Sequence, residues 1–227
     1  IYNVPDGTLF VDGHDVNSVT LHSLRENCSY VPQDNFLFSD TIANNIAFAF
    51  DETDKAAVKR AAELADVDDN IVEFKDGYDT VLGERGVTVS GGQKQRIAIA
   101  GMLAIEPQVL VLDEATAMLD PLGRKDVLRI VKDLNRKKGI TVIMITQYME
   151  ETVIADRVIV MNEGLVAFEG TPAEVFRRGT ELRKINLDVP PMVELRDDLA
   201  ARGIIEPCNA MTVEEMANEL CPLLLKI

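Results

Sequence analysis

Residues that build metal centres and disulfides are scarce in this chain of 227 residues. Cys28, Cys208 and Cys221 are few, odd in number and without the spacing of metal ligands, so we expect reduced thiols. His14 and His22 have no evident acidic partner or third ligand in the sequence, and we interpret both as surface or turn residues.

Basic residues are also scarce, since 23 Lys and Arg stand against 38 Asp and Glu, a formal net charge of −15. Nucleic acids are bound through clustered Lys and Arg, so this balance argues against a nucleic acid as the main partner. Nucleotides are still compatible with it, because backbone N–H groups and Mg²⁺ can hold their phosphates.

Long hydrophobic runs are missing as well. No apolar run approaches the roughly 20 residues that span a bilayer, and the first residues do not resemble a signal peptide. Hydrophobic residues nevertheless make up 47% of the chain, which is enough for a buried core. We therefore expect one large domain, or a domain with an appendage, that is soluble or held at a membrane by a partner.

The most informative stretch is residues 89–120, VSGGQKQRIAIAGMLAIEPQVLVLDEATAMLD. It opens with a polar, glycine-rich turn that leads into an almost wholly apolar helix. Two glycines at a helix start let backbone N–H groups approach an anion, and the helix dipole favours negative charge there. The residues of this turn are Ser90, Gly91, Gly92 and Gln93.

An apolar run, Val109–Leu112, follows the helix and ends in two adjacent acids, Asp113 and Glu114. Because the run has no polar alternation, it predicts a parallel strand covered on both faces. Open α/β sheets bind ligands at the carboxyl ends of their strands. One acid there can hold Mg²⁺ through water, and the next can orient a water for attack on a phosphoryl group. Taken singly, such a turn is usually only a turn, and such a pair of acids is usually a helix cap or solvated.

Together, in this order, these pieces resemble the signature motif, Walker B motif and D-loop of the ATP-binding cassette family. The resemblance implies an α/β fold, a P-loop NTPase-type cassette core with a helical subdomain. In it Asp113 would hold Mg²⁺, Glu114 would be the general base and Asp120 would lie in the D-loop. ATP would be bound in trans by the signature residues Ser90, Gly91, Gly92 and Gln93.

Segments before the signature most resemble cassette exporters. The turn Val31–Asp34 is similar to a Q-loop, in which Gln33 would contact Mg²⁺ and the attacking water. The segment Asn35–Ile46 resembles the exporter segment that leads into the helical subdomain. The loop Gly77–Gly86 resembles the X-loop, which touches the intracellular helices of the membrane domain. A polar turn and a solvated loop are the alternatives for the first and last of these segments.

Segments after the signature, such as GITVIMITQYMEE and LDVPPMVEL, are more similar to the ATPase subunits of energy-coupling factor transporters. In that group a C-terminal appendage makes contacts between the two ATPase subunits. Thr212 and Glu215 form a capping box that predicts a helix in this region. We predict a cassette domain at 1–186, its helical subdomain at about 43–102, and a helical appendage at 187–227. A divergent natural cassette, a recombinant gene and an engineered or misassembled chimera all fit the change of resemblance.

Two features depart from the family. No G-x-x-x-x-G-K-[ST] motif and no Gly-Lys pair occur. The phosphate loop (Walker A), its strand and the adenine-stacking aromatic would lie upstream of Ile1 and are absent from this sequence. Gln147 stands where the family has the switch histidine. An amide can donate a hydrogen bond to a γ-phosphate, but it cannot become a cation or relay a proton, so enzyme activity is left open.

The missing strand has a consequence for the sheet. In the family it lies between the strands that match Ile140–Ile145, which the sequence predicts to be buried, and Arg157–Met161. Without it, both neighbours would have unpaired backbone groups, and bare edges recruit other strands. We predict a chain that is marginally stable, aggregates, or pairs these two strands with each other or with another chain.

The resemblance implies an ATP-binding, ATP-hydrolysing subunit of a membrane transporter, with ATP and Mg²⁺ as its ligands. It would form a head-to-tail pair with a second ATPase subunit, identical or different, on transmembrane subunits or a transmembrane domain. It would be peripheral, at the cytoplasmic face of the cell membrane. One alternative is a hydrolysis-incompetent cassette that contributes only its signature face. Another is a cassette ATPase of DNA repair or translation, against which the X-loop resemblance and the acidic charge weigh.

Overall fold

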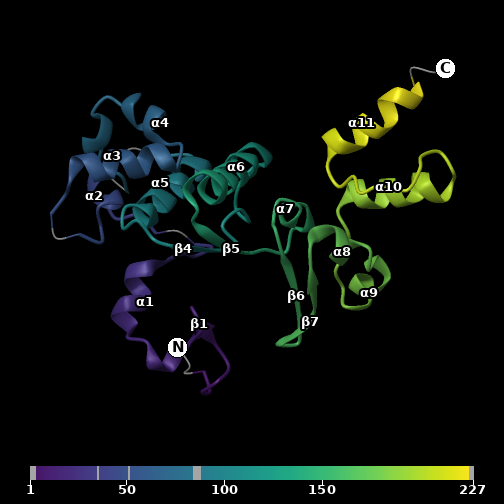
Figure 1. Ribbon diagram of the computed structural model, residues 1–227. Helices are drawn as coiled ribbons and strands as arrows, with labels where there is room; N and C mark the ends of the chain where they lie inside the picture. Colours follow the sequence, from purple (N-terminus) through teal and green to yellow (C-terminus); the bar gives the residue numbers. More distant parts are fainter. Residues whose placement is uncertain (1–3, 35, 51, 84–87, 225–227) are drawn as a thin grey trace. The chain divides into compact units, whose positions relative to one another are not determined.

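The computed structural model describes residues 4–34, 36–50, 52–83 and 88–224 (Figure 1). The chain forms two compact units, residues 1–145 and residues 146–227. The division into a cassette domain at 1–186 and an appendage at 187–227 remains a prediction. Among the described residues, no helix combines the length and the apolar character that crossing a membrane requires.

A parallel three-stranded sheet organises the first unit, in the order β3-β4-β5. Val31 pairs with Leu112 and Asp113 with Ile145, so the carboxyl ends of the three strands lie at one edge. The parallel strand predicted from Val109 is therefore confirmed. Its residues Leu110 and Leu112 are buried, whereas Val109 and Val111 are half-buried, so one face is covered more completely than the other. The strands are β3 (Cys28–Val31), β4 (Val109–Asp113) and β5 (Thr141–Ile145).

Four helices gather beside the sheet in the first unit, as Figure 1 shows for α2 to α5. The long helix α5 packs against α2, α3 and β3. A Cβ on Gly101 would lie 3.2 Å from the carbonyl oxygen of Asn45, so the backbones of α5 and α2 come close there. The bounds are α2 (Ile42–Ile46), α3 (Lys55–Leu64), α4 (Asp68–Val72), the 3-10 turn η2 (Gly77–Asp79) and α5 (Gly91–Leu103).

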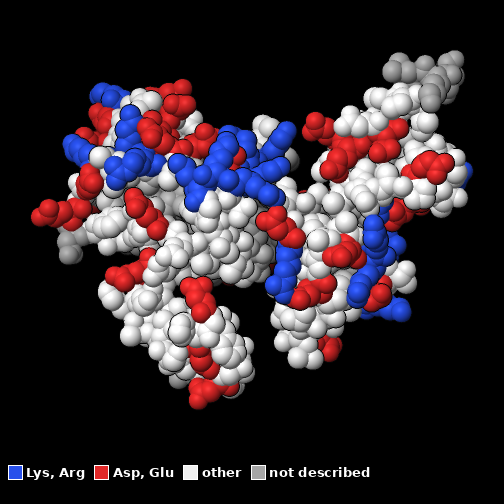
Figure 2. Space-filling view, in the orientation of Figure 1, with Lys and Arg blue, Asp and Glu red and all other residues white. Residues whose placement is uncertain are grey.

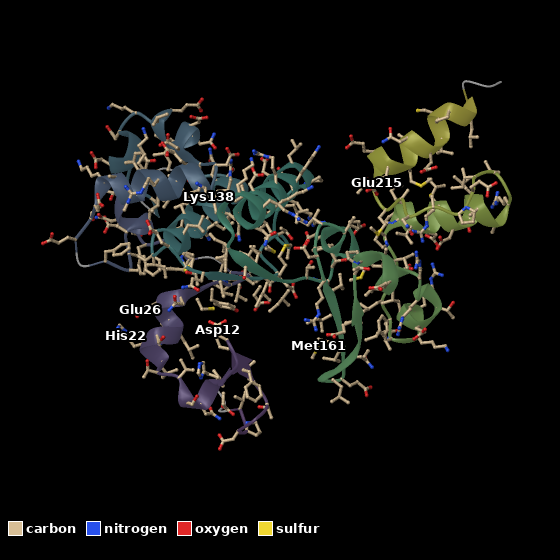
Figure 3. All side chains as sticks on the ribbon, viewed as in Figure 1. Asp12, His22, Glu26, Lys138, Met161 and Glu215 are labelled. Atoms are coloured by element: carbon tan, nitrogen blue, oxygen red, sulfur yellow. The ribbon has the colours of Figure 1, made fainter. Side chains whose placement is uncertain are left out.

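Helix α6 (Pro121–Lys138) is amphipathic and packs on β5 and α5. It begins after Asp120 with a proline at its first position and ends at Gly139, whose φ of 72° suits a glycine C-cap. Its last turn carries three basic residues that complement the helix dipole. Lys138 is labelled at this end in Figure 3, and Lys and Arg gather over α6 in Figure 2.

The first residues of this unit form a small antiparallel hairpin followed by a helix (Figure 1). Its turn uses Asp12 and Gly13, both at positive φ. Thr20 caps the helix by accepting a hydrogen bond from the backbone N–H of Ser23. These elements are β1 (Phe10–Val11), β2 (His14–Asp15), the 3-10 turn η1 (Val16–Ser18) and α1 (Leu21–Asn27).

In its described residues, the second unit has an antiparallel hairpin and five helices. A turn with positive φ at Glu163 and Gly164 joins β6 to β7. Val160, Phe176 and Val193 belong to one buried cluster, which therefore joins the hairpin to α8 and α10. The elements described here are β6 (Val158–Asn162), β7 (Leu165–Gly170), α7 (Met149–Thr152), α8 (Pro172–Phe176), α9 (Gly179–Lys184), α10 (Pro191–Ala201) and α11 (Val213–Leu224).

The capping box predicted before the last helix is confirmed. The N–H of Thr212 donates to Glu215 Oε2 at 3.0 Å, and the N–H of Glu215 donates back to Thr212 Oγ1 at 3.2 Å. The same carboxylate accepts from the N–H of Met211 at 2.8 Å. These bonds, first of all the one from Met211, lower the pKa of Glu215. Figure 3 labels Glu215 on α11.

Strands β5 and β6 each have one partner strand in the part of the chain that the structure describes. Pairing of these two strands with each other or with another chain stays a prediction. The strand predicted at Ile140–Ile145 is confirmed from Thr141 onward, but its predicted burial is wrong, since Ile143 and Ile145 are 48% and 50% exposed. Met161 on β6, labelled in Figure 3, is 56% exposed. Exposed and half-buried residues alternate along β5, so one face of the strand is left uncovered in the described residues.

The direction of the backbone bonds identifies which amides of β5 face its open edge. The N–H of Thr141 donates to the carbonyl of Gln108 at 2.9 Å, and the carbonyl of Ile145 accepts from the N–H of Glu114 at 2.8 Å. Because N–H groups alternate in direction along a strand, Ile143 also faces β4. The N–H groups of Val142 and Met144 therefore face away from it.

We predict that hydrogen exchange separates these two sets of amides. In the monomeric chain, Val142 and Met144 should exchange faster than Ile143, because only Ile143 is bonded to β4. Exchange followed residue by residue by NMR measures this directly, with Ile143 as the internal control. Equal protection of all three amides in a monomer would contradict an open β5 edge.

Candidate nucleotide site

The start of α5 is built by a reciprocal pair of hydrogen bonds. Ser90 Oγ accepts from the N–H of Gln93 at 3.2 Å, and Gln93 Oε1 accepts from the N–H of Ser90 at 2.9 Å. This capping box satisfies two backbone donors that a helix start leaves unpaired. A serine hydroxyl also has a proton to donate, and Ser90 is exposed. It can therefore cap its helix and donate to an external acceptor at the same time.

The two signature glycines bring α5 close to the start of α6. A Cβ on Gly92 would lie 3.7 Å from the Cα of Gly123, and a Cβ on Gly91 would lie 3.7 Å from Leu119 Cδ2. Two helix N-termini therefore lie side by side, each with backbone N–H groups and a positive dipole end. The structure thus brings the predicted signature and D-loop segments together on one surface, and an anion is the ligand that such a surface favours.

Asp120 caps α6 by accepting a hydrogen bond from the N–H of Gly123 at 2.7 Å. A Cβ on Gly123 would lie only 3.1 Å from this carboxylate oxygen. Gly123 was missed by sequence reasoning, because nothing in the local sequence shows that another helix approaches it. Asp120 itself is exposed, so its carboxylate reaches the surface that carries the signature.

Asp113 and Glu114 follow one another at the carboxyl end of β4, and both are half-buried. Asp113 Oδ2 accepts a hydrogen bond from the hydroxyl of Tyr30 at 2.7 Å. That bond, with smaller contributions from burial and from the negative charge of Asp113, raises the pKa of Tyr30. Tyr30 was also missed. The signal for it is the strand register, which pairs Tyr30 with Val111, two residues before Asp113.

Glu114 has a φ of 47°, in the left-handed region that non-glycine residues rarely adopt. Its N–H donates to the carbonyl of Ile145, which fixes the backbone to the end of β5. A left-handed residue costs about 1–2 kcal/mol, and such strain is concentrated at functional sites.

The two predicted glutamines follow strand ends. Gln33 is exposed and lies two residues after β3, at the same carboxyl edge as Asp113. Gln147 is exposed and follows the last residue of β5 by two positions, in the second unit.

Hydrogen bonds of Thr146 stabilise the turn around Gln147, and the sequence did not reveal them. Thr146 Oγ1 accepts from the N–H of Tyr148 at 3.0 Å and donates to Glu151 Oε2 at 2.6 Å. Glu151 is only 1% exposed, so this bond satisfies a buried carboxylate. A Thr at a strand end with an acid one helical turn later was the available signal.

The donor set suits Mg²⁺ rather than a metal held by protein groups alone. In the described residues, no three His, Cys, Asp or Glu come together to hold a metal. Mg²⁺ keeps several waters and takes one or two carboxylates plus substrate phosphates. Asp113 has this character, since one of its oxygens accepts from Tyr30 and the carboxylate lies at the ligand-binding edge of the sheet.

The predicted X-loop is described only in part, since residues 84–87 lie outside the described residues. What is described packs along the predicted exporter-like segment: Ile42 N–H donates to the carbonyl of Thr80, and Leu82 N–H donates to that of Asp40. In the same segment Phe36 and Phe38 contact each other edge to face, and they are 75% and 52% exposed. Asn35 is outside the described residues.

We predict that Asp120 stabilises the fold through its cap. Asp120→Ala should lower the free energy of unfolding by about 1 kcal/mol, because the N–H of Gly123 loses its acceptor. Asp120→Asn keeps an acceptor oxygen and should stay within a few tenths of a kcal/mol of the parent. Urea unfolding of the three proteins measures the difference. Equal losses for Ala and Asn would show that the cap is not the cause.

Comparison with known proteins agrees with this arrangement. The family model described as ABC transporter matches residues 1–117. The energy-coupling factor transporter ATP-binding protein EcfA1 of Clostridium novyi (strain NT) is 40% identical over 223 residues, covering 96% of this chain and 77% of that protein. The protein of the same name from Caldanaerobacter subterraneus subsp. tengcongensis is 41% identical over 220 residues, covering 95% of this chain and 77% of that one.

A solved structure is similar as well. It is described as the structure of a bacterial Atm1-family ABC exporter with ATP bound, and it matches with a TM-score of 0.66 and 38% identity. The match covers 74% of this chain but only 30% of the exporter chain. The chain is therefore similar to energy-coupling factor proteins along nearly all of its length and to an exporter over most of it, so both kinds of resemblance predicted from the sequence are found.

Proposed function

The chain belongs to the ATP-binding cassette (ABC) transporter family and is the ATP-binding subunit of an ABC-type transporter; we propose that its signature face completes a nucleotide site on a second ATPase subunit. The observation that carries this proposal is the close approach of α5 and α6 at Gly92 and Gly123. It places Ser90, the free N–H groups of two helix starts and Asp120 on one exposed surface. Such a surface suits the terminal phosphate of an ATP that is held mainly by another subunit.

In this proposal, the carboxyl edge of the sheet binds Mg²⁺ and carries the residues for hydrolysis. There Asp113 would hold Mg²⁺, which neutralises charge on the phosphates when bound. Glu114, on its strained turn, would take a proton from the attacking water, while Gln33 and Gln147 would hydrogen-bond to the water or the γ-phosphate. Tyr30 would keep Asp113 in place through its hydroxyl. This edge also needs a phosphate loop, which the 227 residues do not contain.

The partners follow from the same comparison. The similar proteins are named as energy-coupling factor transporter ATP-binding proteins, which supports a role on transmembrane transporter subunits at the cytoplasmic face of the membrane. Exposed Phe36 and Phe38, beside the backbone bonds that join Thr80 and Leu82 to the same segment, form an apolar surface for helices of such a subunit. Similarity to transporter proteins sets aside the alternative in DNA repair or translation.

A second candidate function is a hydrolysis-incompetent subunit. Two observations favour it: the sequence has no G-x-x-x-x-G-K-[ST] motif, and Gln147 occupies the position of the switch histidine. A glutamine side chain cannot carry a proton from water to phosphate. Such a subunit would still present Ser90 to its partner, because α5 and its capping box are complete.

We predict that Ser90 controls pairing with the second subunit. Mixed with a cassette subunit that carries a phosphate loop, and with ATP and Mg²⁺, the parent chain should form a dimer. Ser90→Arg should abolish it by placing bulk where the γ-phosphate would lie, whereas Ser90→Ala, which loses only the hydroxyl, should weaken it less. Size-exclusion chromatography with light scattering measures the pair. An Arg variant that dimerises as well as the parent would refute the signature role.

We predict that Glu114 matters only where a phosphate loop is supplied. In a protein with such a segment joined ahead of Ile1, Glu114→Gln should slow ATP turnover by about 10²–10⁴-fold, the usual contribution of a general base. Gln147→His should raise turnover, because imidazole can relay a proton. Phosphate release at saturating ATP measures both. An unchanged rate in Glu114→Gln would remove Glu114 as the base, and no turnover in any variant would favour the second candidate function.

A further inference from the structure

A separate cavity lies in the second unit, formed by α8, α10 and the loop that leads toward α11. Its volume is about 340 Å³, at the lower end of the size of small-molecule sites. None of the residues considered for the nucleotide contributes to it. It is lined by Arg177, Arg196, Asp197, Ala200, Pro207, Cys208 and Asn209.

Arg196 supplies a buried positive charge to this cavity. Arg196 is 5% exposed. Its side chain donates through Nε to Asp197 Oδ1 at 2.8 Å and through Nη1 to the carbonyl of Ala210 at 3.5 Å. Nη2 lies 2.7 Å from the same carboxylate oxygen. A guanidinium has five N–H groups, so the contacts made by the described residues leave part of its donors for another acceptor.

Arg177 supplies a second guanidinium on the cavity wall. Its Nη2 donates to Asn209 Oδ1 at 3.0 Å, which is a neutral acceptor, and its charge also helps to lower the pKa of Glu174, which does not line the cavity. The lining therefore holds two guanidinium groups against one carboxylate, that of Asp197, although the whole chain has a net charge of −15. Figure 2 shows Lys and Arg gathered over α8 and α9 in this unit.

Local contacts and hydrogen bonds fix the segment around Cys208 that forms one wall of the cavity. Cys208 packs against the small buried cluster of Ile205, Ala210 and Met216. The capping box of Glu215 fixes the residues that follow, as described above for Met211 and Thr212. A cavity with a fixed wall loses little conformational freedom when a ligand enters.

We propose that this cavity binds a small anion that carries a phosphate or a carboxylate group, with Arg177 and Arg196 as its two donors. Guanidinium groups match such anions because their N–H groups form parallel, charge-assisted hydrogen bonds. The half-buried thiol of Cys208 lies on the same wall and reports on occupancy. The anion comes either from a free solute or from the headgroup of an acidic lipid, and the two sources share this chemistry.

The thiol provides the test. With Cys28→Ser and Cys221→Ser, Cys208 is the only thiol in the full-length chain. We predict that the ratio of its reaction rate with a dianionic disulfide, 5,5′-dithiobis(2-nitrobenzoate), to that with neutral 4,4′-dithiodipyridine exceeds the same ratio for free cysteine. Arg177→Gln should lower the ratio of the two rates by about tenfold, the effect of one charge-assisted hydrogen bond. Inorganic phosphate or citrate should slow the modification in the parent.

Matched variants separate charge from structure. Arg202→Gln removes the same charge from an exposed position at the end of α10 that does not line the cavity, and its rate ratio should stay at the parent value. Arg177→Lys keeps the charge and should keep most of the preference. Thermal unfolding by circular dichroism checks that each variant is folded.

Two further comparisons identify where the anion comes from and which result would overturn the proposal. Protection of Cys208 by soluble phosphate or citrate assigns a free solute, and protection only by vesicles that contain phosphatidic acid assigns a lipid headgroup. No protection by either at about 10 mM anion, well above a millimolar dissociation constant, overturns the site. An equal rate ratio in Arg177→Gln and Arg202→Gln also overturns it. ATP pairing through Ser90 does not depend on either outcome.

Discussion

The position of β4 between β3 and β5 determines where every acid of the nucleotide site lies. Asp113 ends the strand beside Ile145, and the hydroxyl of Tyr30 reaches it from β3. The N–H of Glu114 donates to the carbonyl of Ile145, which joins the turn after β4 to the end of β5. Helix α5 precedes β4 in the chain and α6 follows it, and the N-termini of the two helices come close at Gly92 and Gly123. If β4 lost its register by one residue, every one of these groups would change face.

Much of the site could be predicted because its signals are local. Ser90 and Gln93 are three residues apart and cap the same helix start, and Asp120 followed by proline marks the next one. An uninterrupted apolar run before Asp113 suffices to predict a parallel strand. Each of these features depends on neighbours in sequence, so no knowledge of the tertiary fold is needed.

Most of the features that were missed depend on residues far apart in the chain. Tyr30 and Asp113 are 83 positions apart and meet only through the strand register. Gly123 is required by the approach of another helix. The exposure of Ile143 depends on what covers its face of β5, which the apolar pattern of that strand cannot show. Hydrophobicity predicts that a strand can be buried, whereas topology decides whether it is.

The two functional faces differ in what they need from the rest of a transporter. At the predicted signature, the capping box of Ser90, the close approach of Gly92 to Gly123 and the Asp120 cap are all made by residues 90–123. At the carboxyl edge, Asp113 and Glu114 can act on a phosphate only if something else holds it. In the proposed function, the start of α5 and the carboxyl edge of the sheet therefore have separate roles, because they are built by different residues.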